Sequence, residues 1–262
     1  MKDPVEKLYD QLAEGAAEEA LITARQLLAA DPDDPVVRFL TGVACLDLDR
    51  PAEAALELRH AVKLDPEDAE FRAQLSNAEF RSCRFEEALE QAEAALELDE
   101  ALPDAHATRG LVLERLGELD RADAAFAVAA EIDGETFPAP LRLSDDDFDA
   151  AMSEAIDFLA PEFRKHLETV AVTVDPLPAD ALLQESDPPL DPELLGLFVG
   201  VPLSEGGHES QLPPQIYLFR RNLERIFPDR EELRDEIART LHHELGHYLG
   251  LDEEELDAID LG

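Results

Sequence analysis

Two histidines and a glutamate near the C-terminus are the residues whose spacing most directly suggests chemistry. They are His243, Glu244 and His247, in the stretch LHHELGHYLGLDEEE (residues 241–255). Side chains four residues apart project from one face of a helix, so both imidazoles can reach one ion. Zinc prefers such nitrogens in a tetrahedral shell, and a neighbouring carboxylate then reaches a water on the ion and accepts its proton. The HExxH pattern therefore predicts His243 and His247 as ligands of Zn²⁺ and Glu244 as a general base.

A third ligand is expected shortly after these histidines. The sequence continues for only fifteen residues after His247, which we expect to exclude a ligand on a distant second helix. Gly250 can adopt a positive φ and reverse the chain where the first helix ends. A residue two or three positions further on would then return to the metal. Glu253 is the predicted third ligand, and Asp252 and Glu254 are the alternatives.

The elements around this stretch indicate a small α+β domain at residues 144–262. Apolar residues recur every fourth position over 229–249, which predicts a long helix with one buried face. The histidines and Glu244 lie outside that apolar stripe, so a second face is left for the site. Ser144 is a predicted helix cap, and residues 170–174, 194–203 and 215–220 are predicted strands. The stripe consists of Leu233, Ile237, Leu241, Leu245 and Leu249.

The first half of the chain repeats every 34 residues, and a linker at 137–143 follows it. The predicted units are 1–34, 35–68, 69–102 and 103–136. Small residues recur in phase where two helices of a unit would touch. Matching positions are Ala20, Ala54, Ala88 and Ala122, and also Leu27, Ala61, Ala95 and Ala129. This period resembles the tetratricopeptide repeat, a helix–turn–helix unit. The predicted fold class is thus an all-α repeat solenoid followed by a small α+β domain.

Resemblance to tetratricopeptide repeats implies a groove that binds a protein partner. Two interpretations stay open: the groove takes an apolar or basic partner segment, or the second domain covers it. The expected groove positions are mostly apolar. They include Val5, Tyr9, Val36, Phe39, Val43, Asn77, Phe80, Leu111 and Arg115.

Residues 144–262 resemble the minimal zincin family of zinc metallopeptidases. The resemblance rests on LLGLFVGVPL, LPPQIYLFRRNLER and TLHHELGHYLGLDEEEL. It implies a short sheet packed on the active-site helix and an acidic third ligand. Glu253 also matches the third-ligand register of the HExxHxxGxx(H/D) pattern, although the methionine turn of true metzincins is absent. The implied zincin-like domain hydrolyses peptide bonds.

Composition limits the partners. The chain has 62 acidic and 22 basic residues among 262, a net charge of −40. Such a field repels phosphate backbones and anionic lipid surfaces, so nucleic-acid and membrane partners are not expected. The N-terminus has no apolar segment typical of a signal peptide, and we expect a cytoplasmic protein.

The sequence predicts a zinc-dependent metallopeptidase whose repeats recruit a peptide or protein substrate. The alternative is a non-catalytic tetratricopeptide interaction scaffold with a zinc-binding domain. Among the remaining candidates, His242 is expected to pack or to support a ligand rather than bind metal. Tyr217 is open as either a core residue or an oxyanion donor, and His208 is a weaker candidate in a loop.

Overall fold

The computed structural model describes residues 3–205, 213–227 and 229–258. The chain divides into two compact units, and each is described by itself. The first contains Met1–Phe137 and Gln184–Asp191, and the second contains Pro138–Leu183 and Pro192–Gly262. The short segment Gln184–Asp191 comes from the stretch that the sequence assigns to the second domain. Within the first unit, the Leu190 carbonyl lies 3.5 Å from the Cys83 thiol.

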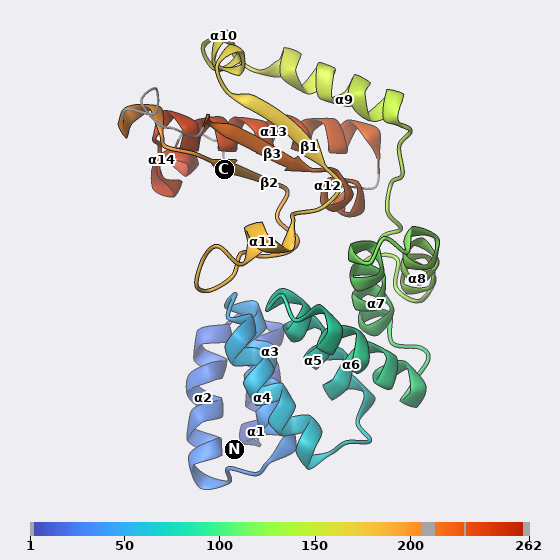
Figure 1. Cartoon of the computed structure of the whole chain (residues 1–262). Coiled ribbons are helices and arrows are strands. Elements are labelled where there is room, and N and C mark those ends of the chain that lie inside the picture. Colours follow the sequence, from blue (N-terminus) through green and yellow to red (C-terminus); the bar gives the residue numbers. More distant parts are fainter. Residues whose placement is uncertain (1–2, 206–212, 228, 259–262) are drawn as a thin grey trace. The chain divides into compact units, whose positions relative to one another are not determined.

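The first unit consists of helix pairs, one pair in each 34-residue repeat (Figure 1). Aspartates cap the N-termini of several of these helices. The Asp34 carboxylate accepts from the Val36 and Val37 amides, and Asp68 accepts from Phe71. These caps satisfy amides that have no partner inside the helix. The pairs are α1 (Pro4–Ala13) with α2 (Ala17–Ala30), α3 (Pro35–Asp47) with α4 (Pro51–Leu64), α5 (Ala69–Arg81) with α6 (Phe85–Leu98), and α7 (Pro103–Arg115) with α8 (Leu119–Ile132).

Small side chains allow the paired helices to approach each other closely. The four alanines that recur every 34 residues are all fully buried. They are Ala20, Ala54, Ala88 and Ala122. The helical-repeat part of the predicted fold class is confirmed.

Two of the expected groove positions are core residues instead. Phe39 stacks on Phe71 with ring centroids 4.8 Å apart, and Phe80 packs against Phe85 at 5.5 Å. Both Phe39 and Phe80 are buried, because aromatic contact with another helix, α5 for Phe39 and α6 for Phe80, removes more apolar surface from water than exposure in a groove would. Tyr9, by contrast, is 50% exposed.

The second unit is built on a three-stranded sheet with the order β1-β3-β2. β1 (Ala171–Asp175) pairs in parallel with β3 (Gln215–Phe219), and β2 (Gly196–Val199) pairs with β3 in the antiparallel direction. β2 is therefore an edge strand. The helices are α9 (Asp145–Phe158), α10 (Pro161–Arg164), α11 (Asp180–Leu183), α12 (Arg220–Ile226), α13 (Arg230–Leu249) and α14 (Glu253–Ala258), with 3-10 turns η1 (Lys165–Glu168) and η2 (Leu203–Glu205).

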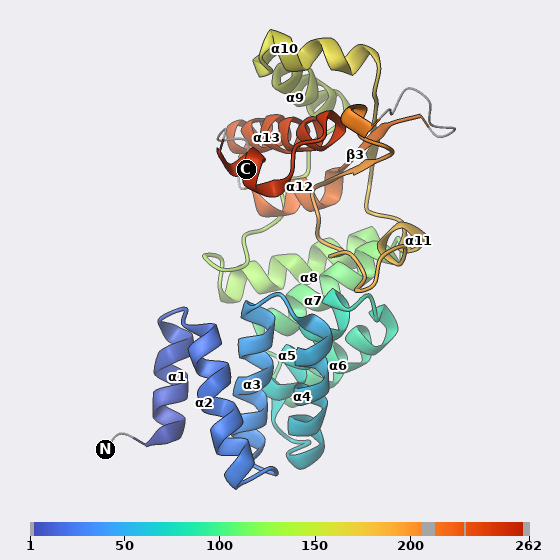
Figure 2. The same ribbon diagram turned by 90° about the vertical axis from the view of Figure 1, so that its left-hand side faces the viewer.

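Helix α13 is the centre of this unit and packs against both the sheet and α9 (Figures 1 and 2). Four of the five residues of its predicted stripe, Leu233, Ile237, Leu241 and Leu245, are 0% exposed, and the fifth, Leu249 at the end of the helix, is partly buried. They pack with Phe148 of α9 and with Ile216 and Leu218 of β3, among others. The α+β part of the predicted fold class is confirmed, and the core fixes the rotation of α13 about its axis.

Within the described ranges, no helix is both long and apolar enough to span a bilayer.

Candidate functional site

Helix α13 projects two imidazoles toward one point. The helix begins at Arg230, where the Asp229 carboxylate accepts from the amides of Glu231 and Glu232. His243 and His247 lie one turn apart, and their Nε2 atoms are 3.0 Å from each other. Both rings are partly exposed, so a ligand from solvent can reach them.

The chain reverses direction directly after α13. Gly250 has φ +94, in the left-handed region that glycine adopts without strain. The Leu251 amide donates to the Gly246 carbonyl at 3.0 Å, and the Gly250 amide donates there too, so the last carbonyls of the helix are satisfied. The turn brings the following residues back beside the histidines.

A second, short helix then holds Glu253 in place. Glu253 is the first residue of α14. The Asp252 carboxylate accepts from the Glu255 amide at 2.9 Å, and the Glu255 carboxylate accepts from the Asp252 amide at 3.1 Å, which forms a capping box. Leu256 is fully buried and packs onto Gly246, where a side chain would meet it. The position of Glu253 is therefore set by a capped helix that folds back onto α13.

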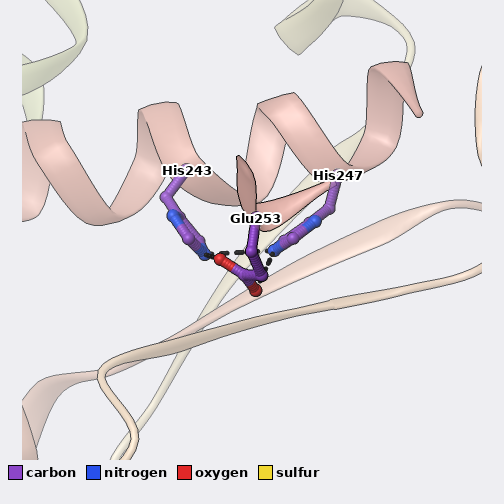
Figure 3. Close-up of side chains that lie close together, drawn as sticks. All are labelled: His243, His247 and Glu253. Atoms are coloured by element: carbon purple, nitrogen blue, oxygen red, sulfur yellow. Dashed lines mark hydrogen bonds and ion pairs between the residues drawn. The ribbon is translucent and has the colours of Figure 1, made fainter. Parts of the chain in front are cut away.

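The Glu253 carboxylate faces both histidines (Figure 3). Its Oε1 lies 3.3 Å from His247 Nε2, and its Oε2 lies 3.6 Å from His243 Nε2. Ligand atoms of a tetrahedral zinc at about 2.0–2.1 Å are about 3.3–3.4 Å apart. The distance of 3.0 Å between the two Nε2 atoms, and the distances of 3.3 and 3.6 Å from them to the two oxygens of the Glu253 carboxylate, are close to this value. Two imidazoles and a carboxylate are also the donor types that zinc prefers, so these residues fit the ion.

The Nδ1 atom of His247 has a hydrogen-bond partner of its own, so Nε2 is the nitrogen that remains for the metal. Nδ1 lies 3.2 Å from the Leu251 carbonyl. A carbonyl oxygen only accepts, so Nδ1 carries the proton and Nε2 presents its lone pair. Such an outer partner orients a metal-binding imidazole and fixes its tautomer.

Glu244 is close to the histidines but is far less exposed than Glu253. Its relative exposure is 7%, whereas the Glu253 side chain is 72% exposed. Burial raises the pKa of the Glu244 carboxyl to about 7, a hydrogen bond from the Phe198 backbone opposes that shift, and the charge of Glu253 adds to it. A carboxyl with a pKa near neutrality can both accept and return a proton under ordinary conditions.

The edge strand β2 lies against this carboxylate. The Phe219 amide donates to the Leu195 carbonyl, so Leu195 and Phe219 form a hydrogen-bonded pair. In antiparallel strands such pairs alternate with pairs whose backbone groups point away from each other. With Gly196 opposite Leu218 and Phe198 opposite Ile216, the backbone groups of Gly196 and Phe198 point to the free edge. This agrees with the hydrogen bond between the Phe198 amide and Glu244.

A buried asparagine holds the chain that enters β2. Asn222 of α12 is 0% exposed, and its Nδ2 donates to the carbonyls of Pro192 at 3.0 Å and Leu194 at 2.7 Å. Because both carbonyls lie just before β2 in the chain, the Asn222 side chain fixes where the edge strand begins.

Two cavities meet at the histidine and glutamate side chains. One has a volume of about 580 Å³, and the other has about 310 Å³. Both are lined by His243 and Glu244. The larger also contains Leu197, Phe198, Gly200, Pro202, His247, Gly250, Leu251, Asp252 and Glu253, and the smaller contains Leu194, Leu195, Gly196, Glu236, Arg239 and Thr240. The candidate site thus opens into space on both sides of Glu244.

Among the remaining candidates from the sequence, Asp252 lines the larger cavity, whereas His242 packs elsewhere. His242 packs on Phe163 with ring centroids 5.1 Å apart, and burial lowers its pKa. Tyr217 stacks on Phe219 at 6.3 Å and lines neither cavity. Asp252 is engaged as a helix cap. His208 lies outside the described residues.

Several residues of the site were missed by sequence reasoning. The Asp252–Glu255 capping box is a readable D-x-x-E signal and could have revealed α14. Gly196, Phe198 and Asn222 gave no such signal, because their roles depend on contacts with distant parts of the chain.

Comparison with known proteins agrees with the sequence motif. Residues 167–262 match the family model described as zincin-like metallopeptidase, which covers less than half of the chain. The resemblance of the C-terminal region to this family is therefore confirmed. No curated protein matches the chain significantly.

Several solved structures are similar to the chain in fold. The crystal structure of MamA is 24% identical, with 60% of this chain and 85% of that chain covered and a TM-score of 0.43. A thermophilic TPR protein of Thermus thermophilus is 22% identical, with coverages of 51% and 76% and a TM-score of 0.45. MamA from Desulfovibrio magneticus is also 22% identical, with coverages of 50% and 76% and a TM-score of 0.44.

Proposed function

We propose that the second unit is a zinc-dependent peptidase whose metal is held by His243, His247 and Glu253. The observation that carries this proposal is the convergence of both Nε2 atoms and the Glu253 carboxylate, whose ligand atoms lie within 4.8 Å of one another, beside a buried carboxyl. The similarity of residues 167–262 to zincin-like metallopeptidases supports the reaction class. Three protein ligands leave a fourth tetrahedral position open, as a catalytic zinc site requires and a structural one does not.

Glu244 is the proposed general base. When bound, zinc supplies a Lewis acid that polarises the scissile carbonyl and acidifies a water. The Glu244 carboxylate takes a proton from the water as the oxygen of the water attacks the carbonyl carbon of the peptide. It then delivers this proton to the amine nitrogen as the C–N bond breaks. Burial raises the pKa of this carboxyl above that of an exposed glutamate, which makes its carboxylate a stronger base for the first transfer.

The edge strand β2 is the proposed binding surface for the peptide. An extended substrate can add to a free edge through main-chain hydrogen bonds. The outward backbone groups of Gly196 and the Phe198 carbonyl are proposed to supply these bonds next to Glu244, whose carboxyl already accepts from the Phe198 amide. Phe198, Pro202 and Leu251 give the larger cavity apolar walls, which favours an apolar substrate side chain there.

The helical repeats are proposed to recruit the substrate or a partner protein. Their fold is typical of domains that bind other proteins, and the acidic composition favours basic partners. A non-catalytic scaffold is the rival function.

Chelation separates these two functions. The zinc-loaded protein is incubated with a diverse peptide library, then again after chelation and after zinc is restored. Cleavage that disappears on chelation and returns with zinc supports the peptidase. Absence of cleavage by the zinc-loaded protein favours the scaffold. His243→Ala is expected to lose zinc, whereas His242→Ala is the matched control on the same helix and should keep it.

A further inference from the structure

Gly196 occupies the place where β2 comes closest to α13. A Cβ atom built there would lie 2.6 Å from Thr240 Cγ2, 3.1 Å from Glu244 Cγ and 3.1 Å from the Tyr217 carbonyl oxygen. The first distance is far inside van der Waals contact, and the other two are tight. Only hydrogen fits between the edge strand and the helix at this point.

The surrounding groups cannot easily move aside. Thr240 is 7% exposed and belongs to the middle of α13, and its branched side chain has few alternative rotamers on a helix. The Tyr217 carbonyl is backbone of the central strand β3. A methyl group at position 196 must therefore push β2 away from α13 or turn the Glu244 side chain.

We propose that Gly196 is a positioning residue for Glu244, because its missing side chain lets the free edge of β2 lie directly against that carboxylate. This role rests on the proposed peptidase function. The distance between β2 and Glu244 sets the distance between the proton acceptor and the carbonyl of a peptide carried on the strand. Displacement by about 1 Å from reacting geometry can cost about 100-fold in rate.

The two cavities give this contact a further consequence. Of the residues that the structure describes, only His243 and Glu244 line both cavities, and Gly196 lines the smaller one. The contact between Gly196 and Glu244 therefore lies where the two cavities meet, and a peptide bound in both cavities would lie beside it.

The test compares four proteins: wild type, Gly196→Ala, Thr240→Ser and the double variant. Thr240→Ser removes only the methyl group that would clash and keeps the hydroxyl. We expect Gly196→Ala to bind zinc within about threefold of wild type, and to lower kcat about 10- to 100-fold with a smaller change in KM. The double variant should recover most of the lost kcat relative to Thr240→Ser alone.

Each result has a defined meaning. A Gly196→Ala protein that cleaves like wild type contradicts the positioning role and leaves the peptidase intact. A loss of kcat that Thr240→Ser does not reverse, or that is matched by an equal loss of zinc affinity, also contradicts it. If zinc-loaded wild type cleaves no peptide, the proposed function itself is wrong and this role falls with it.

Discussion

His243 and His247 point their Nε2 atoms at each other across 3.0 Å, with ring planes at 87°. The Leu251 carbonyl holds the proton of His247 on Nδ1, so the Nε2 of that ring is a lone-pair donor. A shared cation satisfies both Nε2 atoms and the neighbouring Glu253 carboxylate at once. This relationship is the physical basis of the proposed zinc site.

Glu253→Ala is expected to weaken zinc binding by at least about 100-fold, since even outer partners of metal ligands are worth about 10- to 100-fold. Competition with a chromophoric chelator measures the change. Glu254→Ala is the matched control because it neutralises the next residue of the same acidic run. If Glu253→Ala binds zinc as tightly as wild type, the third ligand is another residue.

Gly250→Ala should destabilise the second unit and misplace Glu253. A side chain at φ +94 is strained by about 1–3 kcal/mol, and its Cβ would lie 1.9 Å from the Ser204 hydroxyl oxygen. Thermal unfolding and zinc titration measure both effects. Combining the change with Ser204→Ala removes the clash with the hydroxyl oxygen but leaves the Cβ of residue 204 at 2.8 Å and the backbone strain, so only partial recovery is expected. Full stability in Gly250→Ala alone would show that the turn differs.

Glu244 should make the stability of the chelated protein depend on pH. Burial raises its pKa from 4.5 to about 7, so the folded state holds a proton that the unfolded chain releases between these values. The contribution is fully present below pH 4.5 and is lost as pH rises through about 7, and it amounts to about 3 kcal/mol at most. Urea unfolding of wild type and Glu244→Gln from about pH 4 to 8 measures it. Parallel pH profiles of the two proteins would contradict a buried carboxyl.

Glu79 is predicted to be important for the stability of the helical repeats. Its side chain is 2% exposed and accepts two hydrogen bonds from Arg59, at 2.7 and 2.8 Å, and another from Arg84. Glu79→Ala leaves these guanidinium groups without their partner, at a cost of about 2–4 kcal/mol. Denaturant unfolding should show this loss.

Glu118→Ala is the control for that measurement. Glu118 pairs with Arg121 in an exposed position, and such pairs contribute about 0–1 kcal/mol. Equal effects of the two substitutions would argue against the buried network.

Local periodicity explains how much of the fold was predictable. The 34-residue period and the stripe from Leu233 to Leu245 repeat over many positions, so chance matches are few. In contrast, nothing in the local sequence separates Phe39 and Phe80 from true groove positions. Their burial depends on the aromatic rings of other helices, Phe71 of α5 for Phe39 and Phe85 of α6 for Phe80.

The candidate site was predictable where spacing along the chain sets the geometry. The pair His243 and His247 follows from helical spacing, and the turn at Gly250 follows from its freedom to adopt positive φ. The contact of Gly196 with Thr240, and the hold of Asn222 on the start of β2, join residues far apart in sequence. Only the folded structure reveals such contacts.

Cleavage by the Glu244→Gln variant tests the central claim most directly. Wild type and variant are loaded with zinc, their metal content is measured, and each is incubated with the same peptide library. We predict equal zinc content and cleavage that is lower in the variant by at least about 100-fold, because only the proton acceptor is removed. Equal cleavage by both zinc-loaded proteins, or none by wild type, would contradict the proposed peptidase.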